Sequence, residues 1–415
     1  MRHRMNKHRS PSLLGGAMII AATTVGAGMF SLPVTSAGMW FNYSLLVLAI
    51  AWLCMLLSGL FVLETNLHYP DGASFDSMVG DTLGRPWRVA NGISIAFVLY
   101  ILTYAYISGG SSIVSHLMEA TAGIEMDSRL ASLSFAGVLA VIVWIGAGAV
   151  DRISTLMIGA MILTFAAASS DLMSGVSPQH LWPNDSGNTE YAIFGLAALP
   201  FMLASFGYHG NVPSLVKYYG KRPATIAKAL LLGTGLAFVI YVLWLTLTFG
   251  NLSQQQLLPV IQAGGNMGDL VAALEHNSQG SIGSVLSIFA NLAVASSFLG
   301  VTLGLFDFIA DLFGFDNTLS GRNKTAAITF LPPLLLALAW PHGFIYAIGF
   351  AGLAATLWAA IVPALMARTI RRRYPNAPYR APGGQAGIMV VIAFGLLVAV
   401  CEIASKLQLL PVFGQ

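Results

Sequence analysis

Apolar residues follow one another along this chain in runs much longer than the apolar stripe of a soluble helix. A run of about 20 such residues is enough to cross the roughly 30 Å of hydrocarbon in a bilayer. No stretch shows the period-2 alternation that is typical of a membrane β-strand. The pattern predicts an all-α membrane protein with eleven transmembrane helices, near residues 13–37, 40–67, 89–118, 131–149, 153–175, 191–217, 224–249, 281–312, 324–340, 344–368 and 386–407.

Glycine and proline interrupt two of these runs. The first interruption is "TTVGAGMFSLP" at residues 23–33, and the second is "ASFGYHGNVP" at residues 204–213. Glycine weakens a helix by about 1 kcal/mol and proline by about 3 kcal/mol relative to alanine. Backbone groups that are freed at membrane depth are tolerated only against protein or a water-filled cavity. Interruptions at matching places in two halves of a membrane chain therefore indicate a transporter's central binding site.

The interrupted helices are the first and the sixth, which makes them equivalent if helices 1–5 and 6–10 form inverted repeats. Five helices are an odd number, so the second set would enter the membrane from the opposite side. We expect an N-terminal tail (1–12), a first repeat (13–175), a second repeat (191–368) and an additional helix (386–407). Other glycines, such as Gly16, Gly300 and Gly304, are expected to serve close helix packing.

Composition agrees with a chain that is surrounded by lipid. Hydrophobic residues make up 56% and charged residues 9%, whereas a soluble domain carries about 25% charge. Cys54 and Cys401 lie far apart in apolar runs, which favours buried thiols over a disulfide or a metal site. The basic start "MRHRMNKHRSPS" precedes a long run without a small-residue cleavage site, so we expect no removed signal peptide.

The basic residues gather on one side of the predicted helices. With the N-terminus in the cytoplasm, only Arg129 and Lys406 of the 20 Lys and Arg residues fall outside the inner side. A miscounted helix would reverse every later loop and remove this asymmetry. We therefore expect a cytoplasmic N-terminus and a periplasmic C-terminus. The same bias accounts for most of the net charge of +3, so no nucleic-acid partner is expected.

The two interruptions also indicate what the site would bind. An unwound first helix presents backbone N–H groups at the start of its second half, and the positive end of that helix dipole favours a carboxylate by about 0.3–1 kcal/mol. Unwound carbonyl groups of the sixth helix can accept hydrogen bonds from an ammonium group. A zwitterion fits both, so the pattern indicates an α-amino acid, in part by analogy with other transporters that contain broken helices.

Aromatic and polar side chains beside the breaks are expected to form the substrate pocket. Tyr100 and Tyr104 lie four residues apart on one face of the third helix, where their hydroxyls could meet an indole or a phenol. The alternative is ordinary aromatic packing in a membrane core. The predicted substrate-binding residues are Gly26, Ala27, Gly28, Met29, Phe30, Ser31, Tyr100, Tyr104, Phe201, Ser205, Phe206, Gly207, Tyr208 and Asn211.

Ionisable side chains inside membrane spans are costly and usually functional, so they are candidates for ion coupling. His209 lies in the second break, where it either takes up a proton or braces the unwound backbone as a neutral imidazole. Glu64, near the inner end of the second helix, either couples or braces helix packing. Asp307 and Asp311 on the eighth helix are expected to face the cytoplasmic vestibule or pair with a loop cation. No cofactor or metal ion is expected.

Five segments carry a resemblance to a known family: "GAGMFSLP", "YILTYAYISG", "SFGYHGNVPSLVKYYG", "ASSFLGVTLGLFDFIADLFGF" and "IVPALMAR". They are similar to the bacterial hydroxy/aromatic amino acid permeases of the amino acid–polyamine–organocation superfamily, and the similarity covers about residues 10–412. The chain most resembles the tryptophan-specific permeases, in which the second break reads Tyr-His-Gly-Asn, as Tyr208–Asn211 do here. Tyrosine permeases tend to have Phe and Ser at the first and last of these positions.

The resemblance implies a leucine-transporter-like fold with a 5+5 inverted repeat, and proton-driven import of tryptophan across the bacterial cytoplasmic membrane. It implies tryptophan and protons as partners besides the membrane lipids, and such folds can work as monomers. One departure concerns the coupling ion. Some members of the superfamily carry a lysine in the fifth helix, whereas this chain reads "LMIGAMILTF" there, with Met161, which excludes a lysine switch at that place.

Several alternatives stay open. The coupling ion could be sodium, with Ser296 and Ser297 near it, and the substrates could include tyrosine. A transporter-derived amino acid sensor would share the broken helices. A channel would need repeated polar rings rather than one pair of breaks. An enzyme is not expected, because the chain contains no H-E-x-x-H, G-x-S-x-G or P-loop motif.

Overall fold

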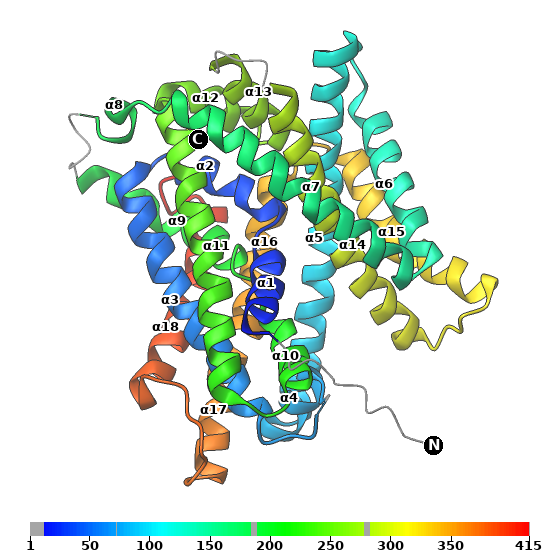
Figure 1. Ribbon diagram of the computed structural model, residues 1–415, viewed down its shortest axis with the longest axis vertical. Coiled ribbons are helices and arrows are strands. Elements are labelled where there is room, and N and C mark those ends of the chain that lie inside the picture. Colours follow the sequence, from blue (N-terminus) through cyan, green and yellow to red (C-terminus); the bar gives the residue numbers. More distant parts are fainter. Residues whose placement is uncertain (1–11, 72, 184–188, 278–282, 415) are drawn as a thin grey trace, which may run out of the picture.

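Every regular element of the described chain is a helix (Figure 1). The computed structural model describes residues 12–71, 73–183, 189–277 and 283–414, so the predicted N-terminal tail lies outside it except for Ser12. Its α-helices are α1 (Leu13–Thr24), α2 (Ser31–Ser36), α3 (Trp40–Asn66), α4 (Phe75–Leu83), α5 (Arg85–Ala122), α6 (Ser128–Ile145), α7 (Ala147–Ser174), α8 (Pro178–Leu181), α9 (Gly195–Ala204), α10 (Val212–Tyr219), α11 (Pro223–Asn251), α12 (Gln254–Gln262), α13 (Met267–Asn277), α14 (Gly283–Phe313), α15 (Leu319–Ala339), α16 (Phe344–Thr356), α17 (Val362–Arg373) and α18 (Gly384–Lys406).

Four short helices of other types accompany them. Three are 3-10 helices, η1 (Ala27–Phe30), η2 (Thr189–Phe194) and η3 (His209–Asn211), and η4 (Leu357–Ile361) is a π-helix between α16 and α17. A π-helix inside an α-helix is frequent at functional sites. Two of the four, η1 and η3, lie at the interruptions that the sequence predicts.

Fewer of the described helices meet the length and hydropathy of a membrane span than the eleven that the sequence predicts. Within the described ranges nine helices are long and apolar enough to cross a membrane, and a tenth span results if α1 and the η1–α2 segment count as one bent span. The expected span at 324–340 corresponds to α15, which has 21 residues but is not among the nine. Arg322 and Lys324 lie in its first two turns, and Pro332 and Pro333 lie inside it. The crossing of α15 stays a prediction.

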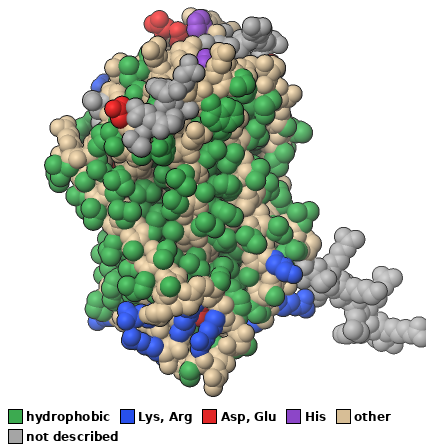
Figure 2. All heavy atoms as spheres, turned by 90° about the vertical axis from the view of Figure 1, so that its left-hand side faces the viewer, with side chains coloured by type: hydrophobic (Ala, Val, Ile, Leu, Met, Phe, Trp, Pro, Cys, Tyr) green, Lys and Arg blue, Asp and Glu red, His purple; other side chains and the backbone are tan. Residues whose placement is uncertain are grey.

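The surface separates apolar and charged side chains along the long axis. Figure 2 shows hydrophobic side chains over the middle of one face, with Lys and Arg at the lower end and Asp, Glu and His at the upper end. The lower end in Figure 1 holds α4, α10 and α17, and the upper end holds α8, α12 and α13. This arrangement is that of a multi-pass membrane protein with one basic end.

Long-range packing joins helices that are far apart in the sequence. α1 packs against α11, α14 packs against α5 and α7, and α16 packs against α5 and α9. The close-packing role expected of Gly16 is confirmed, because a Cβ there would collide with the Tyr219 hydroxyl. The same expectation is wrong for Gly300 and Gly304, since a Cβ at either would meet nothing within 4 Å.

Candidate functional site

The predicted break in the first helix is confirmed. α1 ends at Thr24, Gly26 is extended (φ −159°, ψ −156°), and the two arms of the span are bent by 51°. The backbone N–H of Ala27 donates to Ser297 Oγ of α14 at 3.1 Å. A Cβ on Gly26 would lie 2.5 Å from the same Ser297 oxygen, so only glycine allows α14 to approach the break this closely. Ser31 Oγ donates to the Gly28 carbonyl at 2.7 Å, within the break itself.

The second interruption is also present, between α9 and α10. Its span, Glu190–Tyr219, contains the short helix η3 and the exposed glycines Gly207 and Gly210. Tyr208 is 1% exposed, and its hydroxyl donates to the Met55 carbonyl of α3 at 3.0 Å. The tyrosine thereby ties the interrupted segment to a continuous helix, which stabilises a backbone that has lost part of its own hydrogen bonding.

Two contacts connect the breaks to one another. The Tyr241 hydroxyl of α11 lies 2.6 Å from the Thr24 carbonyl and 2.7 Å from the Ser205 carbonyl, so it can donate to either one. Asn211 Nδ2 donates to Thr23 Oγ1 at 2.6 Å. Tyr241 is 0% exposed and is a functional candidate that the sequence analysis missed. It looks like any aromatic residue in an apolar run, and no local signal distinguishes it.

Aromatic rings surround the joined breaks. Phe30 lies 5.3 Å from Trp244 and 5.6 Å from Phe289 between ring centroids, and Phe206 lies 5.4 Å from Tyr241. The indole nitrogen of Trp244 is buried and has no hydrogen bond partner in the described structure. The predicted pocket residues Phe30, Phe201 and Phe206 are all buried. These contacts between ring faces and edges form a buried aromatic cluster beside the two breaks.

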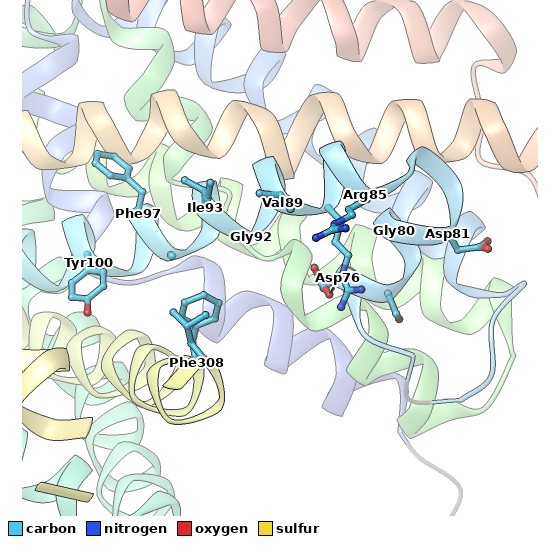
Figure 3. A pocket seen from close by; sticks show the side chains of 14 residues that line it. Asp76, Gly80, Asp81, Arg85, Val89, Gly92, Ile93, Phe97, Tyr100 and Phe308 are labelled. Atoms are coloured by element: carbon cyan, nitrogen blue, oxygen red, sulfur yellow. Dashed lines mark hydrogen bonds and ion pairs between the residues drawn. The ribbon is translucent and has the colours of Figure 1, made fainter. Parts of the chain in front are cut away.

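The two tyrosines predicted on the third helix point elsewhere. The Tyr100 hydroxyl donates to the Ile328 carbonyl of α15 at 2.9 Å, and the Tyr104 hydroxyl donates to the Trp340 carbonyl at 2.8 Å. Tyr100 also borders a cavity of about 1040 Å³ between α4, α5 and α14, together with Phe97 and Phe308 (Figure 3). The breaks do not border that cavity. A substrate-binding role for these two tyrosines therefore stays a prediction.

One face of α14 connects the first break with two glycines that have empty space beside them. Ser297, Gly300, Gly304, Asp307 and Asp311 follow one another at intervals of three and four residues, which places them on the same helix face. Ser297 contacts the first break, the two glycines have empty space beside them, and both aspartates are exposed. No described cation forms a salt bridge with either aspartate. This face of α14 therefore runs from the first break to the two exposed aspartates, and their place at a cytoplasmic vestibule stays a prediction.

The two other predicted coupling residues differ in their surroundings. His209 is 0% exposed, stacks on Tyr208 at 4.7 Å and meets Trp358 of η4 edge-on at 6.1 Å. Neither ring nitrogen makes a hydrogen bond of strict geometry to a described residue, but the ring lies within reach of the Met55 backbone, so bracing of the backbone by this histidine stays a prediction. Glu64 accepts from Arg371 through both carboxylate oxygens at 2.7 Å and from the Ala381 amide at 2.8 Å. Glu64 therefore braces helix packing.

A second buried glutamate was missed. Glu402 of α18 is 1% exposed, and its Oε1 lies 3.4 Å from Lys406 Nζ, without hydrogen-bond geometry. The sequence does contain a signal for this residue, which is a carboxylate inside the last apolar run. Because Lys406 follows four residues later, the two residues resemble an ordinary ion pair at the end of a helix.

Sequence comparison with known proteins places the chain in a family. Residues 9–402 match the tryptophan/tyrosine permease family. A tryptophan-specific transport protein of Pseudomonas aeruginosa is 52% identical, over 97% of each chain. A low affinity tryptophan permease of Escherichia coli is 44% identical, over 97% of this chain and 98% of the relative. A tyrosine permease of Enterobacter agglomerans is 42% identical, over 98% of this chain and 99% of the relative.

Proposed function

This chain belongs to the tryptophan/tyrosine permease family, and we propose that it imports tryptophan across a bacterial cytoplasmic membrane in symport with protons. As a permease it is a transporter rather than an enzyme. The substrate follows from relatives about half identical over nearly the whole chain, which are named tryptophan-specific transport proteins. The observation that carries the mechanism is the pair of helix breaks whose carbonyls share the Tyr241 hydroxyl.

The breaks would bind the zwitterionic part of the substrate. The backbone of Gly26–Ser31 would hold the carboxylate at the amino end of η1 and α2, where the helix dipole is positive. Carbonyls at Ser205–Gly207 would accept from the ammonium group. The indole would pack among Phe30, Phe206 and Trp244, which already contact one another or Tyr241.

Transport would proceed by alternating access around this site. We propose eleven spans with the basic end in the cytoplasm, and two inverted repeats (13–175 and 191–368) followed by the helix at 386–407. The empty space beside Gly210, Gly300 and Gly304 supports an opening toward the basic end, because Asp307 and Asp311 continue the same face of α14. One chain holds both breaks, so a monomer is sufficient.

Proton coupling needs a group that gains and loses a proton within the cycle. Glu64 is a poor candidate, because Arg371 and the Ala381 amide occupy both of its oxygens. Asp307 and Asp311 would act at the vestibule. His209 is enclosed beside the substrate site and contacts η4 through Trp358, so its protonation would bear on both. A sodium-coupled cycle is the alternative, with Ser297 beside the Gly26 break.

The test is uptake of labelled tryptophan into proteoliposomes under a pH gradient, a sodium gradient or neither. With one proton per substrate, one pH unit should give about tenfold accumulation, because it supplies about 1.4 kcal/mol. Excess unlabelled tyrosine should compete weakly. Accumulation driven by sodium alone would refute proton symport, and equal competition by tyrosine would refute tryptophan specificity.

A variant of the first break tests the site. Gly26→Ala places a methyl group 2.5 Å from Ser297 Oγ and should disrupt the Ala27 amide contact. We expect tryptophan uptake to fall by about tenfold or more, as removal of a well-placed hydrogen-bonding contact does. Gly137→Ala of α6 is the control, since a Cβ there meets nothing within 4 Å. Equal uptake by the two variants would contradict a substrate site at this break.

A further inference from the structure

The carboxylate of Glu402 is buried with little to stabilise its charge. Lys406 is the one cation that the described chain places within ion-pair distance, and the 3.4 Å contact to Oε1 lacks hydrogen-bond geometry. An ionised carboxylate that leaves water costs several kcal/mol unless ion pairs and hydrogen bonds replace its hydration. A protonated carboxyl group does not carry this cost. The site therefore accommodates both protonation states better than a fully paired carboxylate would.

Lys406 has other partners when Glu402 is neutral. Its Nζ lies 4.4 Å from the ring centroid of Tyr346 and 5.1 Å from that of Phe350, both on α16. Its side chain is 29% exposed, so water also reaches it. Cation–π contacts of this kind stabilise an ammonium group without an anion. Loss of the Glu402 charge would therefore not leave a buried, unpaired lysine.

A pocket connects Glu402 with the end of the molecule opposite the basic end. The pocket has a volume of about 430 Å³, and Glu402 and Lys406 line it together with Thr35, Phe201 and Gly264. Gly264 follows α12, which lies at the upper end in Figure 1, away from α4 and α17. Thr35 belongs to α2 and Phe201 to α9, which are the halves of the two broken helices on this side. Water in this pocket would supply protons from the periplasmic side.

The other described elements that pack against α18 bring no competing charge to this end. The charged side chains of α3 and α17, which are Glu64 and four arginines, lie toward the basic end (Figure 1), where Glu64 pairs with Arg371. α9 (Gly195–Ala204) and α16 (Phe344–Thr356) contain no Asp, Glu, Lys, Arg or His, and Tyr346 is the titratable residue among them. Among the residues that line the pocket, Glu402 and Lys406 are the charged ones. The charge of the pocket therefore changes mainly through these two side chains.

Glu402 lies against α16 at a point where α9 also packs closely. A Cβ on Gly349 of α16 would lie 2.6 Å from Glu402 Oε1 and 3.2 Å from Cζ of Phe201. Glu402 and the outer half of the broken sixth helix thus crowd one point on α16. A change in the charge or hydration of the carboxylate would therefore bear on the packing of α9, α16 and α18 at this point.

We propose that Glu402 is a proton-binding residue of this transporter. It takes up a proton from the outer pocket, and Lys406 is its counter-ion in the ionised state. This inference rests on the proposed proton symport and adds a residue to it. The proton comes from periplasmic water, binds the carboxylate, and is released to the cytoplasmic side after the molecule has reoriented with its substrate.

The experiment compares Glu402→Gln with the matched variant Lys406→Met in proteoliposomes. The glutamine mimics a permanently protonated carboxyl group. We expect Glu402→Gln to exchange internal and external tryptophan without a gradient within about twofold of the parent chain, because the substrate site is intact. Its accumulation under one pH unit should fall from about tenfold to the gradient-free level. A pH-sensitive dye inside the vesicles should report proton entry with tryptophan for the parent and none for this variant.

Lys406→Met removes the same ion pair but keeps the carboxylate. We expect it to accumulate tryptophan, with half-maximal uptake at a higher external pH, because the counter-ion that favours the ionised form is gone. Two outcomes would overturn the proposal: normal accumulation by Glu402→Gln, or loss of exchange in both variants alike, which a purely structural ion pair would cause. If the pH gradient did not change tryptophan accumulation by the parent chain, the proposed proton symport itself would be refuted, and with it this role of Glu402.

Discussion

Glu64 and Glu402 lie at opposite ends of the molecule and are each 1% exposed, but they differ in the number of partners that stabilise their carboxylates. At the basic end, Arg371 donates to both oxygens of Glu64 at 2.7 Å, and the Ala381 amide adds a third hydrogen bond at 2.8 Å. The guanidinium group itself lies 5.4 Å from the ring centroid of Phe61 and also donates to the Ala381 carbonyl at 3.0 Å. At the opposite end, Glu402 has a single cation at 3.4 Å.

The difference shows that burial alone does not identify a functional carboxylate. A buried carboxylate whose two oxygens both accept hydrogen bonds is held in place, and its partners join α3, α17 and the start of α18 into one unit. A buried charge with few partners remains responsive to the pH and to the packing around it. The first arrangement holds the inner end together, and the second suits a group that must alternate between two states.

The largest expected effect comes from removing one partner of the satisfied pair. Glu64→Gln leaves the Arg371 guanidinium group, 11% exposed, without its carboxylate. We expect a loss of about 3–5 kcal/mol in the free energy of unfolding, measured as a lower melting temperature in detergent, because the charge stays buried. Glu402→Gln should change the melting temperature far less. A larger drop for Glu402→Gln than for Glu64→Gln would reverse the comparison between the two ends.

The control for this measurement is an ion pair at the surface. Asp76→Asn breaks the contact to Arg88 at 2.7 Å, where both side chains are about half exposed. We expect a shift near the limit of detection, because exposed pairs contribute about 0–1 kcal/mol. If Asp76→Asn were as damaging as Glu64→Gln, burial would not explain the result.

A smaller effect is expected where Glu402 crowds α16. Gly349→Ala places a methyl group 2.6 Å from Glu402 Oε1 and should cost about 1–3 kcal/mol of stability through overpacking. In a Glu402→Ala background the methyl group gains room, so the penalty should shrink, and a double-mutant cycle in melting temperature measures the coupling. Gly159→Ala of α7, with nothing within 4 Å of its Cβ, is the matched control. Additive effects of the two substitutions would contradict the tight contact.

Sequence patterns predicted the backbone of the site better than its side chains. The break at Gly26 was predictable, because glycine and proline in an apolar run weaken the helix locally. Tyr241 was not, because its hydroxyl meets carbonyls 217 and 36 residues away in the chain, and only the folded structure brings the ends of α1 and α9 to this point on α11. The hydroxyls of Tyr100 and Tyr104 show the same limit, since helical spacing gives their common face but not the neighbour, α15, that this face meets.

The smallest expected effect concerns Asp81, a carboxylate at the basic end that is well paired but exposed. Hydrogen bonds from Tyr69 and Arg373 hold the pKa of Asp81 below its usual value. A lowered pKa in the folded state contributes stability above the unfolded pKa of about 4, and that contribution disappears as the pH falls through the folded value. Asp81→Asn should therefore lower the free energy of unfolding at pH 7 by at most about 1 kcal/mol, which is measured as a slightly lower melting temperature. The difference between the variant and the parent chain should become smaller as the pH falls below about 4. A difference that persists unchanged at low pH would show that the carboxylate charge is not what stabilises this contact.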